Sequence, residues 1–141
     1  MKGNFLAENF EIMNRSAQFG NALIDRKEFK QWFVGPFIPE SLGLRHTSGV
    51  EIKWGCHTKG ETREQWAQGG KQATISILVR GKFRLRFRSP HDGGTVTEYV
   101  LEKEGDYVIW PPKVDHTWSV EEDCVILTVR WEDQADVPTR L

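Results

Sequence analysis

Gly105-Asp106-Tyr107-Val108-Ile109-Trp110-Pro111-Pro112-Lys113-Val114-Asp115-His116 is the most informative stretch of the chain. Gly105-Asp106 is typical of a turn, because glycine tolerates positive φ and aspartate hydrogen-bonds its own backbone. Tyr107 to Trp110 is rich in β-branched and aromatic residues, which favours a strand. The two prolines end that strand, since neither can donate a backbone N–H. The stretch therefore predicts a turn, a strand, a rigid corner and then His116 at the mouth of a β-barrel, where the next strand returns.

Alternation of apolar and polar residues predicts further short strands on both sides of this stretch. The clearest runs are 50–54, 74–79, 83–88, 95–101, 117–120 and 124–131. Residues 60–73 are polar and rich in glycine, and they predict a loop long enough to be functional. At Arg80-Gly81-Lys82 we expect a tight turn between two strands. Short strands without a long helix or a sequence repeat predict an all-β, antiparallel sandwich or barrel.

Three segments are expected along the chain of 141 residues. Residues 1–40 form an N-terminal arm whose Trp32–Ile38 run, broken by Gly35-Pro36, suits an edge strand. Residues 41–132 form the β-barrel, and residues 133–141 form a polar C-terminal tail. Because such an arm often packs along a neighbouring subunit, we expect a homodimer.

The composition excludes several classes of partner. The formal net charge is −1, so the chain as a whole is not attracted to nucleic acid or to an anionic membrane. The basic row from Lys82 to Arg88 has no stacking aromatic residue on its own face, and we expect Glu98 and Glu102 to neutralise it. No stretch approaches the roughly 20 apolar residues of a membrane span. The chain has two cysteines and no disulfide framework, so we expect a reduced, cytoplasmic protein.

The spacing of Gly105, Pro111 and His116 resembles the second sequence motif of the cupin superfamily, G-x5-P-x-G-x2-H-x3-N. Lys113 replaces the second glycine of that motif, and Val120 replaces its asparagine. The resemblance implies an antiparallel double-stranded β-helix, that is, an RmlC-like jelly-roll barrel. The chain is similar to a group of small single-domain bacterial cupins, some of which carry a signal peptidase I label. The sequence does not support that label, because it contains neither a membrane-anchor segment nor a Ser/Lys catalytic pattern.

The first cupin motif, G-x5-H-x-H-x3,4-E-x6-G, is only partly present. Gly81 matches its last glycine, but counting back through the spacing reaches Thr74 in place of the glutamate. His57 is the only histidine in the matching region, and Gly55 or Lys59 occupies the other histidine position. The sequence therefore retains one histidine in the region of the first motif, beside the histidine of the second.

The resemblance implies a metal site at the barrel mouth, with His57 and His116 as ligands. A third ligand would come from Glu61, Glu64 or Cys56. The divalent metals that suit such a set are Fe, Mn, Ni and Zn. The alternative is that both histidines are structural, that the carboxylates are solvated and that the thiol is a small buried group.

Aromatic and cationic residues near the two histidines predict a small-molecule pocket. The candidate aromatic residues are Trp54, Trp66, Trp110 and Trp118. Aromatic walls with a few polar groups are typical of such pockets, although core packing is the alternative for each tryptophan. Lys59 and Arg63 flank the first histidine, and cations that face inward would favour a carboxylate or phosphate ligand.

Three functions remain open from the sequence. The first is the binding of a small polar or anionic molecule in the barrel, with or without a divalent metal. The second is a metal-dependent enzyme, an oxygenase, isomerase or lyase, that acts on a small metabolite. The third is a metal-free module for ligand sensing or for interaction.

Overall fold

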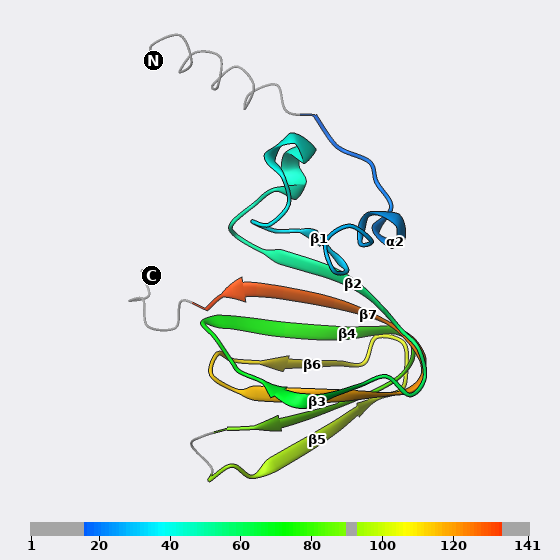
Figure 1. Ribbon diagram of the computed structural model, residues 1–141, viewed down its shortest axis with the longest axis vertical. Helices are drawn as coiled ribbons and strands as arrows, with labels where there is room; N and C mark the ends of the chain where they lie inside the picture. Colours follow the sequence, from blue (N-terminus) through cyan, green and yellow to red (C-terminus); the bar gives the residue numbers. More distant parts are fainter. Residues whose placement is uncertain (1–15, 90–92, 134–141) are drawn as a thin grey trace.

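The computed structural model describes residues 16–89 and 93–133, whose strands form one hydrogen-bonded seven-stranded sheet that folds into two packed layers, the first and the second sheet, with a short N-terminal extension (Figure 1). The elements are α2 (Ala22–Asp25), β1 (Trp32–Val34), a 3-10 helix (Glu40–Arg45), β2 (Glu51–His57), β3 (Thr62–Ala67), β4 (Gln72–Arg88), β5 (Val96–Leu101), β6 (Tyr107–Trp110) and β7 (Asp115–Glu132). All pairings between these strands are antiparallel. The predicted all-β, antiparallel jelly roll is confirmed.

Two long strands, β4 and β7, run through both sheets. The first half of β4 pairs with the last half of β7, and β2 and β6 extend this first sheet on either side, with β1 at its edge. The second half of β4 pairs with the first half of β7, and β3 and β5 extend the second sheet. The pair of β4 and β7 thus belongs to both layers. Where this pair bends, its two halves lie on opposite sides of the space between the layers, so residues far apart in the sequence face one another there.

The bend between the two sheets lies near Gly81 in β4. The register of β4 against β7 shifts between Leu78 and Phe83, as it does at a β-bulge. Gly81 has a φ of +99°, and a Cβ at this position would collide with the carbonyl oxygen of Asp123. The tight turn expected from Arg80-Gly81-Lys82 is therefore wrong. The glycine instead lets one continuous strand bend where the backbone of β7 approaches it closely.

Residues 60–73 are not the unbroken loop that the sequence predicts, because they contain β3. Thr62 and Arg63 lie opposite Ser119 and Trp118 of β7, and Ala67 lies opposite His116. The register is irregular between Arg63 and Ala67, so the segment lacks the regular alternation that would have revealed a strand. This strand forms because it pairs with β7, and such a long-range pairing leaves no signal in the local sequence pattern.

The apolar core fills part of the space between the sheets. Its buried residues are Leu78, Phe83, Leu85, Phe87, Leu101, Trp110, Val120, Cys124 and Ile126. The basic row of β4 faces outward, as predicted, and it is paired with carboxylates. Arg84 lies 2.7 Å from Glu98 and 2.6 Å from Glu121, and Arg88 lies 3.3 Å from Asp115.

The N-terminal extension reaches the first sheet through β1, which pairs with β2 and forms the edge of that sheet. Residues 1–15 of the predicted arm, residues 134–141 of the predicted tail and the hairpin tip at 90–92 lie outside the described residues. The described residues contain no helix long and apolar enough to cross a membrane.

Candidate functional site

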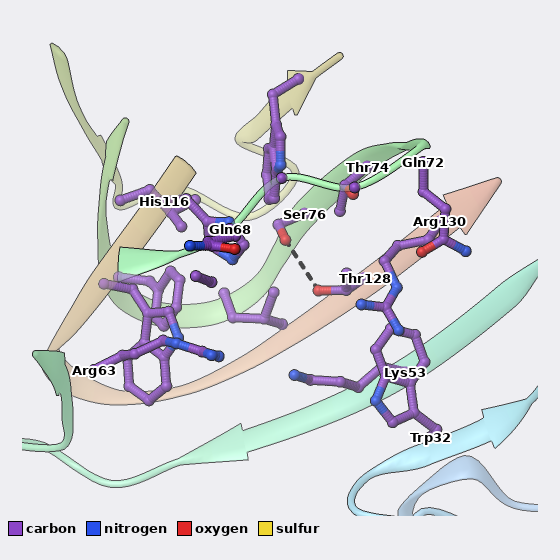
Figure 2. Close-up of a pocket in the computed structure, with 18 of the residues that line it drawn as sticks. Trp32, Lys53, Arg63, Gln68, Gln72, Thr74, Ser76, His116, Thr128 and Arg130 are labelled. Carbon is purple, nitrogen blue, oxygen red and sulfur yellow. Dashed lines mark hydrogen bonds between the residues drawn. The ribbon is translucent and has the colours of Figure 1, made fainter. Parts of the chain in front are cut away.

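A cavity of about 310 Å³ lies between the two sheets (Figure 2). It is lined by residues of β1, β2, β3, β4, β6 and β7, together with the segment that joins β3 to β4. This volume is at the lower end of the range for small-molecule sites. The cavity therefore suits a compact metabolite better than an extended chain.

Neutral hydroxyl groups line the side of the cavity formed by the first sheet. Thr74 and Ser76 of β4 are buried, and Ser76 lies opposite Thr128 of β7. The hydroxyl oxygens of Ser76 and Thr128 are 2.9 Å apart and share a hydrogen bond (Figure 2). Because strand residues alternate between faces, each second residue of these strands points into the cavity.

Three cationic side chains line the same cavity, each from a different strand: Lys53 from β2, Arg63 from β3 and Arg130 from β7. Cζ of Arg130 lies 4.0 Å from the centre of the Trp32 ring, and Nζ of Lys53 lies 5.3 Å from it. Arg130 is paired with Glu51 at 2.5 Å. Figure 2 shows Lys53 and Arg63 approaching the cavity from different strands.

The cations are not balanced by acids within the cavity. Among the described residues, no aspartate or glutamate lines it. In the same part of the chain, neither Lys53 nor Arg63 has a carboxylate partner within 4 Å. Of the three cations, Arg130 alone has a carboxylate within 4 Å among the residues that the structure describes, so the cavity lining carries excess positive charge.

This charge changes the protonation of two groups. Burial is the main cause that lowers the pKa of Lys53 to about 8, and the charges of Arg130 and Arg63 contribute to the same shift. Burial also lowers the pKa of His116 to about 4, with Arg63, Lys53 and Arg130 acting in the same direction. His116 is thus neutral at neutral pH, and Lys53 is partly neutral.

His57 and His116 both line the cavity, so the fold does bring together these two histidines that are far apart in sequence. The ring of His57 packs 4.9 Å from that of Trp118, and its Nδ1 lies 3.7 Å from Oε2 of Glu61. The ring of His116 packs 5.1 Å from that of Trp110. Nδ1 of His116 is buried and has no hydrogen-bond partner among the described residues.

The residues at the positions of the cupin metal ligands do not fit a divalent metal. His57, with Gly55 or Lys59 beside it, lies too far from Gly81 for the spacing of the first motif, so its expected placement there is wrong. Counting back from Gly81 reaches Thr74 in place of the glutamate and Gly70 and Gln68 in place of the two histidines. Thr74, Gly70 and Gln68 line the cavity together with His116, but none of the three has a side chain that commonly binds Fe, Mn, Ni or Zn. Three cations surround the same space, and a metal ion would have to overcome their repulsion.

Of the carboxylates proposed as a third ligand, Glu61 lies beside His57 but does not line the cavity, and neither does Glu64. Glu61 accepts a hydrogen bond from the backbone N–H of Thr58, and Glu64 is exposed on β3. Within residues 16–89 and 93–133, no three histidine, cysteine, aspartate or glutamate side chains form a group that could hold a metal. Cys56 and Cys124 are free thiols.

Of the pocket residues expected from the sequence, Arg63, Trp110 and Trp118 line the cavity. Trp54, Lys59 and Trp66 do not. Trp54 follows Lys53 on β2 and therefore points to the other face. Lys59 is exposed beyond the end of β2, and the ring of Trp66 lies beneath the guanidinium of Arg88, 4.5 Å away.

The residues that sequence reasoning missed are Trp32, Lys53, Gln72, Thr74, Ser76, Thr128 and Arg130. A signal for Lys53 was present, because residues 50–54 alternate apolar and charged side chains. The charged face of such a strand is normally taken as the solvent face. Here Lys53 on that face lines the cavity, while Ile52 and Trp54 point away from it.

The sequence matches no protein-family model and no curated protein. Its structure is similar to that of a cupin superfamily protein from Desulfitobacterium hafniense DCB-2, with a TM-score of 0.53, 16% identity and coverage of 64% of this chain and 73% of the other. It is also similar to KdgF from Halomonas sp., with a TM-score of 0.52, 17% identity and coverage of 67% and 81%.

A third similar structure is peruvianin-I, a cysteine peptidase from Thevetia peruviana latex, with a TM-score of 0.50, 21% identity and coverage of 61% of this chain. This chain spans 52% of the length of peruvianin-I. In a similar structure, CapF, it spans 23% of the length. Identities this low establish the fold alone. The chain has the fold of the cupin superfamily.

Proposed function

We propose that this small cupin-fold protein binds a small organic anion in its cavity, and that its own cations do so without a metal. The observation that carries the proposal is the presence of Lys53, Arg63 and Arg130 on a cavity that no described acidic residue lines. Guanidinium and ammonium groups are the usual partners of carboxylate and phosphate groups in proteins.

The charge and burial of the residues that line the cavity favour such a ligand. A half-buried ammonium without a counterion is costly, and the protein reduces the cost by lowering the pKa of Lys53. Nε of Arg130 is buried and has no acceptor among the described residues. An anion between these groups would supply both a counter-charge and a hydrogen-bond acceptor, neither of which the described residues provide for Lys53 and for Nε of Arg130.

The remaining lining defines the rest of the ligand. Ser76, Thr128 and Gln72 can donate to and accept from hydroxyl or carbonyl groups. Trp110 and Trp118 supply apolar surface for a short carbon skeleton. The set as a whole suits a small hydroxy- or oxo-carboxylate. The metal-dependent enzyme considered from the sequence loses its support, because Gln68, Gly70 and Thr74 replace the other ligands that the first cupin motif would place beside His116.

A thermal-shift comparison tests the proposal. The probes are lactate and malate, each compared with its neutral amide at equal concentration and ionic strength. We expect the acids to raise Tm and the amides to leave it unchanged, since a ligand that binds only the native state stabilises it by mass action. Lys53→Met and Arg63→Met should each reduce the shift.

Lys103→Met is the matched control, because Lys103 is exposed and does not line the cavity. It should keep the full shift. The proposal is overturned if neither acid stabilises the wild-type protein beyond its amide, or if the double variant of Lys53 and Arg63 shows an undiminished shift. Prior treatment with a chelator should not alter the result.

A further inference from the structure

Lys53 differs chemically from the other cations of the cavity, because only an amine can become a nucleophile near neutral pH. Its side chain extends from β2 into the cavity, with Nζ 5.3 Å from the Trp32 ring. Arg130 on β7 and Arg63 on β3 line the same space, and both act on its charge. Within the described part of the chain, no carboxylate lies within 4 Å of Nζ to hold it as an ammonium.

The surroundings of Lys53 make the neutral amine accessible. With a pKa of about 8, roughly a tenth of the molecules carry an uncharged amine at pH 7. Desolvation and neighbouring cations are known means of activating a lysine toward carbonyl compounds. The other titratable groups that line the cavity are His57 and His116, whose pKa values are also lowered, and Glu51 is held by Arg130 at its margin.

We propose that Lys53 captures the carbonyl carbon of a small 2-oxo carboxylate as an imine, while the guanidinium groups of Arg63 and Arg130 hold the carboxylate. The inference rests on the proposed function, because the carboxylate of the 2-oxo acid would bind in the proposed anion site. It adds a covalent step to that binding. A 2-oxo acid carries its carbonyl carbon directly beside the carboxylate. Holding that carboxylate among the cations therefore brings the carbonyl close to the amine.

The step balances without an added oxidant or reductant. The lone pair of Nζ attacks the carbonyl carbon, and proton transfer gives a carbinolamine. Loss of that hydroxyl as water then leaves a C=N bond, and the reverse reaction releases the acid unchanged. His57 and His116 are neutral imidazoles on the same cavity, and such groups can carry the protons of both stages. The protonated imine would attract electrons from the adjacent carbon, as lysine imines do in other enzymes.

Borohydride trapping tests the inference. The folded protein is treated with pyruvate and sodium borohydride, and intact mass and peptide mapping follow. We expect one reduced pyruvyl group per chain, on the peptide that contains Lys53. Acetone, which has the carbonyl but no carboxylate, should be trapped far less. Trapping by pyruvate should increase as the pH rises toward 8, since more of the amine is then neutral.

The variant Lys53→Arg keeps the positive charge and removes the nucleophile. It should therefore lose trapping. Lys103→Arg, at an exposed lysine that does not line the cavity, should be trapped as the wild type is and should keep the thermal shift with lactate, which carries a hydroxyl in place of the carbonyl of pyruvate. The inference fails, and anion binding survives, if lactate stabilises the wild-type protein but pyruvate is not trapped or is trapped equally on surface lysines. If lactate gives no shift over its amide and pyruvate is not trapped, the proposed function fails as well.

Discussion

Lys53 and His116 show how the cavity controls protonation at the scale of single residues. Both are basic side chains whose charged forms are disfavoured by burial and by the same neighbouring cations. A carboxylate that binds beside Lys53 would raise the pKa of its amine again, so that Lys53 takes up a proton and becomes the counterion of the bound carboxylate. It also has a measurable consequence for the stability of the protein in acid.

The substitution His116→Gln should flatten the dependence of stability on pH in the acid range. The pKa of His116 is about 4 in the folded protein, below its unfolded value of 6.5, so the unfolded chain binds the proton more tightly. Stability is therefore present above pH 6.5 and is lost as the pH falls toward 4. The loss is at most on the order of 3 kcal/mol for a shift of this size.

Urea unfolding of wild type and His116→Gln at several pH values between 7 and 4 measures this difference. Other groups contribute an acid-dependent loss in both proteins, so the difference between the two curves is the relevant quantity. Wild type should lose more stability than the variant over this range. Parallel curves would show that His116 titrates normally in the folded protein.

The residues of the site were predictable where they lie in a motif or close to one of the two histidines in the sequence, as Arg63 and Trp118 do. His116 was located by the spacing from Gly105 and Pro111, and Trp110 lies within the same motif. Lys53 and Arg130 belong to no motif, and alternation alone does not say which face of a strand is the inner one. In a barrel with a polar cavity, charged residues can point inward, so the usual assignment of charged strand residues to the solvent face is wrong for Lys53 and Arg130.

At the scale of elements, the bend in β4 is what places Thr74 and Ser76 of the first sheet on the same cavity as Phe83 and Leu85 of the second. Sequence patterns found the two halves of this strand but predicted a turn between them. The halves of β7 were likewise predicted as separate strands. Local alternation is lost at a bulge, and the continuity of a strand across it depends on its pairing partners.

Gly81→Ala should destabilise the protein strongly. A Cβ there would collide with the carbonyl oxygen of Asp123 and would lie 2.5 Å from Cα of Cys124, and φ is +99°. We expect a loss of about 2–4 kcal/mol in the free energy of unfolding, from backbone strain together with overpacking. Chemical denaturation followed by tryptophan fluorescence provides the measurement.

Gly60→Ala is the matched control for that experiment. Gly60 also has a positive φ, of +94°, but no atom lies within 4 Å of the position of its Cβ. Its substitution should therefore cost only the strain, about 1 kcal/mol. Equal losses in the two variants would mean that the close approach of β4 and β7 at Gly81 does not shape the bend.

At the scale of the whole molecule, the fold was predictable because turn signals, strand lengths and the second motif agree with one another. The outer face of the first sheet was not singled out from the sequence. It presents a row of apolar side chains from β2, β4, β6 and β7. They are Ile52, Trp54, Ile75, Ile77, Tyr107, Ile109, Leu127 and Val129. Tyr107 and Ile109 are 60% and 53% exposed.

A contiguous apolar face of this kind is unusual on a monomer, and the homodimer expected from the sequence stays a prediction that this face supports. Size-exclusion chromatography with light scattering should give the mass of a dimer, and Ile109→Glu should shift it toward the monomer. Val96→Glu is the control, because Val96 is similarly exposed, at 52%, but lies on β5 of the other sheet. A wild-type protein that remains monomeric at high concentration would contradict the prediction.

Calorimetric titration of malate at pH 8, in two buffers of different ionisation enthalpy, tests most directly whether the cavity is an anion site. The account predicts saturable binding at one site per chain, with uptake of a proton because the bound carboxylate restores the charge of Lys53. Lys53→Met should lose the proton uptake, and the further change Arg63→Met should abolish the binding. Binding that persists unchanged in the double variant, or no binding to the wild-type protein, would contradict the account.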